Sequence, residues 1–207
     1  RLDRADRASF TLVTPEGEAP IDLKIVGRHH VANALAAAAG ALTLGVSLQT
    51  VAAVLSRARS LSPHRMDVHE LRVDGMDLTL IDDSYNANLD SMRAGIAALA
   101  SIGRDSQRIA VLGEMLELGE SSAADHARTG ELAAQAGAAM LIGIGSTQEA
   151  LETAGARGVE VVGFDDAATA ISQIDALLSD GDAVLVKGSN GSGAWRLADH
   201  LKEVRPR

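Results

Sequence analysis

The stretch Leu78–Met92, LTLIDDSYNANLDSM, decides how the rest of the chain is interpreted. An apolar run of β type ends in two carboxylates, Asp82 and Asp83, and a polar turn follows. Asp90 and Ser91 then offer helix-start chemistry ahead of apolar residues at helical spacing. A strand, a loop at its carboxyl end and a helix predict an open α/β sheet, which binds ligands at such loops. Because Asn and Asp also favour turns by bonding the local backbone, an ordinary turn is the alternative interpretation.

Composition narrows the class of protein. The chain has 207 residues, 46% of them hydrophobic, so it can bury a substantial core. It contains no cysteine, which excludes disulfides, thiolate metal sites and cysteine nucleophiles. The formal net charge of −9 argues against a nucleic-acid partner. No apolar run is long enough to span a bilayer and no signal peptide is visible, so we expect no membrane partner. The first residue is Arg, which indicates a piece of a longer protein.

The charge changes sign along the chain. Residues 1–65 carry 8 basic and 5 acidic residues, whereas residues 66–207 carry 11 and 23. A change of this size indicates a domain boundary, with chance fluctuation of surface charge as the alternative. Arg57–Pro63 is charged, contains serine and closes with proline, as linkers often do. We therefore predict domains at 1–60 and 66–207, joined by a hinge at 61–65.

The first predicted domain begins as a β-hairpin. Residues 8–14 and 21–26 alternate between apolar and polar, and a turn signal at 15–17 separates them. An Ala-rich helix from His29 to near Gly45 follows, and Ser47 can cap a second helix. Two helices and a hairpin are too little for a complete domain, so we interpret them as the end of a larger one.

After Pro63, strands alternate with helices, which predicts βαβ units and a mostly parallel sheet with one antiparallel edge. The predicted strands are 66–73, 76–83, 108–113, 139–145, 159–164 and 183–187, and the predicted helices are 90–102, 121–136, 147–154, 167–179 and 194–204. The fold class is α/β: a Rossmann-like, mostly parallel sheet with helices on both faces, preceded by a β-hairpin and two helices.

The glycine-rich loops do not match a nucleotide-binding fingerprint. Gly143 and Gly145 lack the third glycine of GxGxxG, and the glycines from Gly188 onward have the wrong order. No P-loop of the form GxxxxGK[ST] occurs, so we predict no phosphate cradle within the chain. His29 and His30 point about 100° apart on a helix, with no third ligand nearby, so we predict no metal site there.

DDSYNANLDSM resembles the DDSYNANPDSM signature of the Mur ligase family, in the branch that adds D-alanyl-D-alanine to UDP-N-acetylmuramoyl-tripeptide. Further matches follow in the order of the family's motifs: GRHHVANALAA from Gly27, HRM from His64, IAVLGEMLELG from Ile109 with His126 beyond it, and VLVKGS from Val184. The resemblance implies that residues 1–60 end the central ATPase domain and that residues 66–207 form the C-terminal domain.

The resemblance also implies roles for individual residues. His29 and Asn33 match the segment of the family that contacts the adenine of ATP. Arg65 matches the arginine that reaches the ATP phosphates, and Asp83 matches the aspartate that bonds the ATP ribose. The residues matched to the D-alanyl-D-alanine site are Ser84, Tyr85, Asn86, Asn88, Lys187 and Ser189. The sequence departs from the family pattern at single positions where His30 replaces an asparagine, His64 a glycine, Leu89 a proline and Glu114 an aspartate. It also departs after Ser189, where the family has an arginine and then a methionine-glutamate pair and this chain has Asn190 and then Ala194-Trp195.

The activity implied is ATP-dependent amide bond formation through an acyl phosphate in peptidoglycan synthesis, by a monomer in the bacterial cytoplasm. In the family, the P-loop, a carbamylated lysine and the Mg²⁺ ligands lie upstream, so we expect no catalytic residue or metal ligand here and no activity from this chain alone. Two alternatives remain open. One is the Mur ligase that adds the third residue, although the DNPR-type motif is missing and DSYNAN replaces DYAHTPD. The other is a non-catalytic α/β binding module.

Overall fold

The computed structural model describes residues 1–3, 6–28, 30–59, 63–73 and 75–203. The chain divides into two compact units, Arg1–Leu61 and Ser62–Arg207. This division falls inside the proline-closed segment that the sequence indicated as a linker. Among the described residues, no helix combines the length and the apolar character needed to cross a bilayer.

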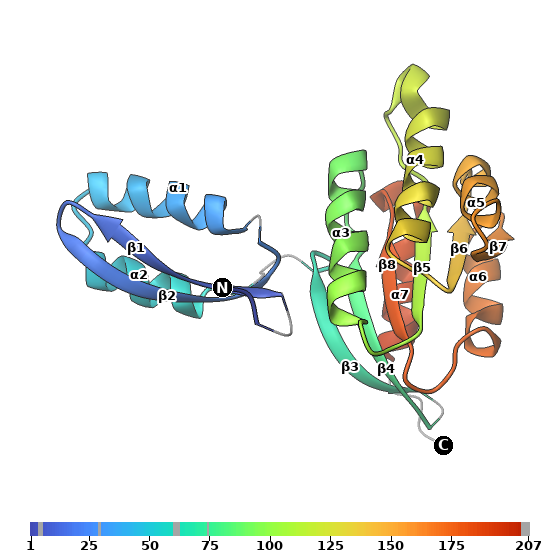
Figure 1. The fold of residues 1–207 in the computed structure, drawn as a ribbon, viewed down its shortest axis with the longest axis horizontal. Helices are drawn as coiled ribbons and strands as arrows, with labels where there is room; N and C mark the ends of the chain where they lie inside the picture. Colours follow the sequence, from blue (N-terminus) through green and yellow to red (C-terminus); the bar gives the residue numbers. More distant parts are fainter. Residues whose placement is uncertain (4–5, 29, 60–62, 74, 204–207) are drawn as a thin grey trace. The chain divides into compact units, whose positions relative to one another are not determined.

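The first unit is a β-hairpin covered by two helices (Figure 1). Its elements are β1 (Arg7–Thr14), β2 (Gly17–Val26), α1 (His30–Thr43) and α2 (Leu48–Arg57). The two strands pair antiparallel, and alternate residues of β2, among them Ile21 and Leu23, are buried against the helices. Ser47 caps α2 by accepting the backbone N–H of Thr50 at 3.3 Å. The predicted hairpin followed by two helices is therefore confirmed.

The second unit is built on a six-stranded sheet in the order β3-β4-β8-β5-β6-β7. The strands are β3 (Asp67–Val73), β4 (Met76–Asp83), β5 (Arg108–Gly113), β6 (Met140–Ile144), β7 (Glu160–Phe164) and β8 (Ala183–Lys187). The helices are α3 (Leu89–Ile102), η1 (Gly119–Ser121), α4 (Ser122–Gln135), α5 (Gln148–Gly155), α6 (Ala167–Gln173), η2 (Ile174–Ala176), η3 (Asn190–Ser192) and α7 (Ala194–Lys202). Only β3 pairs antiparallel with its neighbour, and the other pairs are parallel. The predicted fold class is confirmed.

Helices cover both faces of this sheet (Figure 1). Alternate strand residues such as Leu80, Val111 and Val186 form one core with α6 and α7, while α3, α4 and α5 pack on the other face. Because successive side chains of a strand point to opposite faces, Asp82 faces the α7 side and Asp83 faces α3.

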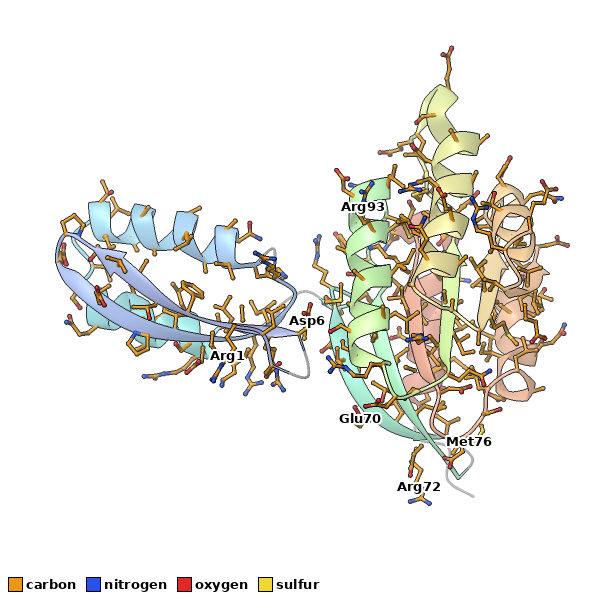
Figure 2. All side chains as sticks on the ribbon, viewed as in Figure 1. Arg1, Asp6, Glu70, Arg72, Met76 and Arg93 are labelled. Atoms are coloured by element: carbon orange, nitrogen blue, oxygen red, sulfur yellow. The ribbon has the colours of Figure 1, made fainter. Side chains whose placement is uncertain are left out.

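The edge strand β3 is protected by charge. Figure 2 shows Glu70, Arg72 and Met76 on the β3–β4 hairpin that forms this edge. Glu70 accepts a hydrogen bond from the Thr79 hydroxyl at 3.0 Å, and Arg72 lies near Asp77 at 3.7 Å. Charged side chains on an edge strand disfavour pairing with another chain.

Several helix ends differ from the sequence prediction by one or two residues, and two helices differ for a structural reason. Helix α3 begins at Leu89 and its N-cap is Asn88 rather than Asp90, because the Asn88 oxygen accepts from the Ser91 backbone N–H and Ser91 reciprocates in a capping box. The helix predicted over 167–179 is interrupted, since α6 ends at Gln173 and continues as the short η2. Val204, the predicted end of the last helix, lies outside the described residues.

Candidate functional site

Three loops meet at the carboxyl edge of the sheet, because β4, β8 and β5 are neighbouring parallel strands. The chain leaves β4 and β5 for helices α3 and α4 on one face, and it leaves β8 for α7 on the other (Figure 1). Open α/β sheets bind ligands where neighbouring connections depart to opposite faces. The loops 84–88, 114–118 and 188–190 therefore outline the candidate site.

A buried ion pair lies at the base of this site. Asp83 and Lys187 are register partners on β4 and β8, and the lysine Nζ donates to Asp83 Oδ2 at 2.6 Å. The same Nζ donates to the Asn86 carbonyl at 2.9 Å, and Lys187 is only 1% exposed. Gly95 of α3 makes room, since a Cβ there would lie 3.0 Å from Lys187 Cδ. Lys187 thus holds the loop after β4 instead of extending into solvent.

The segment that enters the second unit is bonded to the same loop. The other Asp83 oxygen accepts the Met66 backbone N–H at 3.0 Å, and Tyr85 N–H donates to the His64 carbonyl at 2.9 Å. The Arg65 guanidinium lies over the Tyr85 ring, 4.1 Å from its centroid, which is a cation–π geometry. The resemblance assigned Arg65 and Asp83 to ATP and Tyr85 to the dipeptide, and the structure brings these three residues close together.

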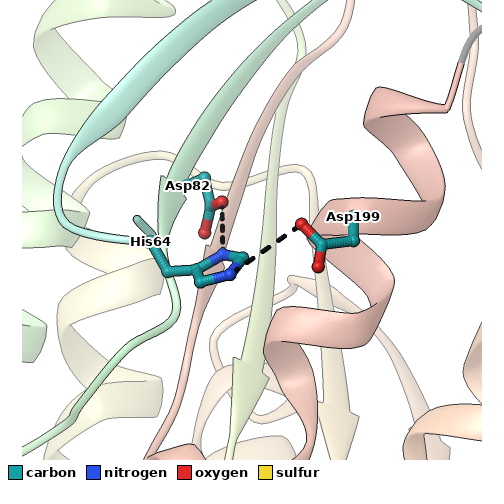
Figure 3. Close-up of side chains that lie close together, drawn as sticks. All are labelled: His64, Asp82 and Asp199. Carbon is teal, nitrogen blue, oxygen red and sulfur yellow. Dashed lines mark hydrogen bonds and ion pairs between the residues drawn. The ribbon is translucent and has the colours of Figure 1, made fainter. Parts of the chain in front are cut away.

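A second polar cluster lies on the opposite face of β4 (Figure 3). The fully buried Asp82 accepts from His64 Nδ1 and Lys202 Nζ, both at 2.8 Å, and from the Ser84 hydroxyl at 2.6 Å. Lys202 also contacts Asp199 at 2.9 Å within α7. His64 Nε2 lies 3.9 Å from that Asp199 carboxylate.

These contacts shift the pKa values of two members of the cluster. Burial alone would raise the pKa of Asp82, but hydrogen bonds from Lys202, Ser84 and His64 together with the Lys202 charge outweigh it, so the pKa lies below its ordinary value. Burial alone would lower the pKa of Lys202, but Asp82 and Asp199 outweigh it, so this pKa is raised. Both groups are therefore charged near neutral pH.

His64, Asp82 and Asp199 form the one group in the described part of the chain whose ligand atoms gather as a metal site requires, within 4.8 Å of one another. The Lys202 ammonium already contacts both carboxylates. The lysine cation offsets one of the two carboxylate charges and bonds one oxygen of each acid, so these residues form a hydrogen-bonded cluster.

The structure gives several of the predicted dipeptide residues a partner within the protein. Ser84 is buried and donates to Asp82. The Asn86 oxygen accepts the Ala87 backbone N–H at 2.8 Å, and the Asn88 oxygen caps α3. These bonds fix the orientation of both side-chain amides. Each side chain therefore has its amide nitrogen left to donate to a ligand.

The loop after β5 is held from two sides. The Ser189 hydroxyl accepts the Leu116 backbone N–H at 2.9 Å, which links the loops after β8 and β5. The buried His126 of α4 accepts the Met115 backbone N–H at its Nε2, at 2.9 Å, and its Nδ1 lies 2.8 Å from the Ser122 carbonyl. This geometry requires the neutral tautomer with the proton on Nδ1.

The remaining predicted ATP residues belong to the first unit. Asn33 is exposed on the first turn of α1, and its amide nitrogen lies 3.5 Å from His30 Nδ1. His29 lies outside the described residues.

Residues 64–190 match the family described as Mur ligase, glutamate ligase domain. The chain belongs to the Mur ligase family. It is 41% identical over 221 residues to the UDP-N-acetylmuramoyl-tripeptide–D-alanyl-D-alanine ligase of Mycobacterium tuberculosis (strain CDC 1551 / Oshkosh), covering 97% of this chain and 43% of that protein. It is 35% identical over 196 residues to the Escherichia coli K12 ligase of the same name, and the match covers 94% of this chain and 41% of that protein.

A crystal structure of MurF from Acinetobacter baumannii shares the fold, with a TM-score of 0.84 and 31% identity over 98% of this chain and 44% of that one. This Mur ligase chain therefore spans less than half the length of the relatives that it matches.

The sequence interpretation of this Mur ligase chain missed the cluster on the second face. Lys202 and Asp199 lie beyond the matched region, on a helix that reads as an ordinary amphipathic surface helix. The available signal was His64, which stands where the family motif has glycine. Its partner Asp82 adjoins Asp83, but only the packing of α7 on the sheet places Lys202 beside Asp82.

Proposed function

We propose that this chain forms the ATP- and dipeptide-contacting part of an ATP-dependent ligase that adds D-alanyl-D-alanine to UDP-N-acetylmuramoyl-tripeptide in the bacterial cytoplasm. The observation that carries the proposal is the 41% identity, over 97% of this chain, to the Mycobacterium tuberculosis protein named for this reaction. The arrangement of the loops after β4, β5 and β8 supports it, because a polar site at this edge suits a nucleotide and a small polar peptide.

At ATP, we assign Arg65 to the phosphates and Asp83 to the ribose. A guanidinium matches phosphate oxygens with two parallel donors, and its stacking on Tyr85 orients it without using those donors. Asp83 retains acceptor capacity beyond its bonds to Lys187 and Met66, since a carboxylate offers about four lone-pair sites. Asn33 and His29 of the first domain are assigned to the adenine.

At the dipeptide, we assign direct contacts to Tyr85, Asn86 and Asn88. Tyr85 is 40% exposed, and both asparagine amides have a nitrogen to donate to a carboxylate or a carbonyl. Lys187, Ser84 and Ser189 support these contacts by holding the loops from below, and Lys187 also brings a positive charge close to the site.

The domain assignment belongs to the same proposal. Residues 1–60 would end the central ATP-binding domain, residues 61–65 would be the hinge and residues 66–207 the C-terminal domain of a monomeric enzyme. Both carboxylates at the end of β4 are already bonded to lysines. We therefore place the Mg²⁺ ligands, with the P-loop, in the part of the relatives that this chain does not cover. Mg²⁺ would neutralise charge on the transferred phosphate.

The test uses an enzyme of the relatives' full length that carries this chain. Phosphate release from ATP should require both UDP-N-acetylmuramoyl-tripeptide and D-alanyl-D-alanine, and the product should contain both. Activity with UDP-N-acetylmuramoyl-dipeptide and a single diamino acid would support the third-residue ligase instead. Binding of these compounds without phosphate release would support a non-catalytic module. The 207-residue chain alone should release no phosphate.

A further inference from the structure

His64 occupies a backbone conformation that few residues other than glycine adopt. Its φ is +60°, in the left-handed region, and the motif that this segment resembles has glycine at the position. A histidine here raises the conformational energy of the backbone relative to glycine. Strain of this kind persists only where surrounding contacts hold the residue in place.

His64 is held by its side chain as well as by its backbone carbonyl, which accepts the Tyr85 N–H. Nδ1 donates to Asp82 Oδ2 at 2.8 Å, and Asp82 is fully buried and ionised by virtue of its bond to Lys202. Since a carboxylate accepts only, Nδ1 must carry a proton. The ring also lies 6.1 Å from the Trp195 ring and 3.9 Å from Asp199, both on α7. The imidazole is therefore enclosed by groups from β4 and α7.

The same residue determines where Arg65 lies. The His64 carbonyl accepts the Tyr85 backbone N–H at 2.9 Å, and the next residue, Arg65, places its guanidinium over the Tyr85 ring. Arg65 itself is exposed, and its backbone is flanked by two residues with positive φ, His64 and Met66. Fixing His64 at its side chain thus fixes the direction in which Arg65 leaves the backbone.

We propose that His64 is a positioning residue: by bonding Asp82, its imidazole holds the backbone from which Arg65 reaches the triphosphate. The consequence for ATP rests on the proposed function of Arg65, whereas the positioning of Arg65 does not. A glycine at this position would permit the backbone conformation without restraining it. In this chain the side-chain bond adds a restraint to those from the His64 carbonyl and the Met66 N–H.

Two variants separate the backbone requirement from the side-chain restraint. His64→Gly keeps the left-handed conformation accessible and removes the bond to Asp82. His64→Asn also tolerates that conformation, and its amide nitrogen can replace Nδ1 as the donor. His69→Asn is the control, since His69 lies on β3 beside Asp67 and outside this cluster. Retained far-UV circular dichroism would verify that each variant is folded.

The first readout needs no activity and uses the 207-residue chain. Tyr85 is the single tyrosine, so nuclear Overhauser contacts from its ring to the Arg65 side chain are assignable. We expect these contacts in wild type, His64→Asn and His69→Asn, and their loss in His64→Gly. Contacts of wild-type strength in a folded His64→Gly would overturn the positioning role.

The second readout is kinetic and uses the full-length enzyme. His64→Gly should raise KM for ATP about tenfold with kcat little changed, and His64→Asn should restore most of the loss. KM for D-alanyl-D-alanine should stay within about twofold of wild type in both. If the Tyr85–Arg65 contacts are lost while KM for ATP is unchanged, the positioning role is supported and the assignment of Arg65 to the phosphates fails. If the KM for ATP and the KM for D-alanyl-D-alanine rise equally in His64→Gly and in His64→Asn, a general loss of structure explains the data. The positioning role is then overturned.

Discussion

Lys187 and Asp83 face each other across two neighbouring parallel strands, and the lysine ammonium lies 2.6 Å from the carboxylate. The lysine is almost completely buried. The same ammonium holds the Asn86 carbonyl. One buried cation thus fixes both the aspartate assigned to ATP and the base of the loop assigned to the dipeptide. The proposed ATP and dipeptide subsites would therefore share one structural support.

Removing that cation should destabilise the second unit. In Lys187→Met, Asp83 loses its counter-ion and the Asn86 carbonyl loses a donor, so we expect the free energy of unfolding to fall by about 3 kcal/mol. Urea denaturation followed by fluorescence of Trp195, the single tryptophan, measures this in the unit that contains the pair. The control is Arg72→Ala, which breaks an exposed pair and should change the free energy by less than about 0.5 kcal/mol. Equal effects of the two changes would contradict the buried pair.

The stability of the second unit should depend on the ionisation of Asp82. Its folded-state pKa lies below the ordinary value of 3.8, so its contribution is fully present above that value and is lost as pH falls through the lower folded pKa. Denaturation midpoints measured from about pH 5 down to about pH 2.5 should therefore fall more steeply in wild type than in Asp82→Asn. The variant should also be less stable near neutral pH, because Lys202 loses the buried one of its two carboxylate partners and keeps only Asp199. Parallel pH profiles would contradict this prediction.

Much of the second unit could be predicted from the sequence because local pattern encodes it. The apolar run of β4, its end at two carboxylates and the helix after the polar loop were all predicted, and the structure has β4 at Met76–Asp83 as expected. The placement of β8 between β4 and β5 is not a local property, since parallel strands pair across long connections. For that reason the resemblance assigned Asp83 and Lys187 separately to two proposed ligands, but the sequence could not predict that the two residues bond each other.

The same reason explains why the Asp82 cluster was missed. Asp82 was interpreted as a strand-end residue, and nothing in α7 distinguishes Asp199 and Lys202 from an ordinary i, i+3 surface pair. Their proximity to His64 follows from how α7 packs back onto the sheet. The unusual φ of His64 could be inferred only from the glycine in the motif that it resembles.

Helix α4 packs so closely against α5 that there is no room for a side chain at Gly130 of α4. An added Cβ would lie 2.1 Å from the Ala150 carbonyl oxygen, and backbone cannot move aside as a flexible side chain can. We expect Gly130→Ala to lower the free energy of unfolding by about 2 kcal/mol or more, although alanine is the better helix former. Gly40→Ala in α1 is the matched control, since nothing lies within 4 Å of the added methyl and stability should rise by up to about 1 kcal/mol. Thermal unfolding of both variants compares them directly, and a stabilised Gly130→Ala would contradict the close contact between the two helices.

Two substitutions at Asn88 can separate the structural role of the loop after β4 from its proposed role in binding the dipeptide. The Asn88 oxygen caps α3, whereas the amide nitrogen is the group assigned to the dipeptide. Asn88→Ser keeps a capping oxygen and loses the amide donor, while Asn88→Ala loses both. We expect Asn88→Ala to lower the free energy of unfolding by about 1 kcal/mol and Asn88→Ser to leave it nearly unchanged.

In the full-length enzyme, both Asn88 variants and Asn86→Ala should raise KM for D-alanyl-D-alanine by roughly tenfold to a hundredfold, because each removes a hydrogen-bond donor from a polar ligand. KM for ATP should be unaffected in Asn88→Ser, since Asp83 and Arg65 are untouched. Steady-state kinetics with each substrate varied in turn provide the comparison. If Asn88→Ser and Asn86→Ala use the dipeptide as well as wild type does, the loop serves only to cap α3 and to carry Tyr85, and the dipeptide must be recognised elsewhere.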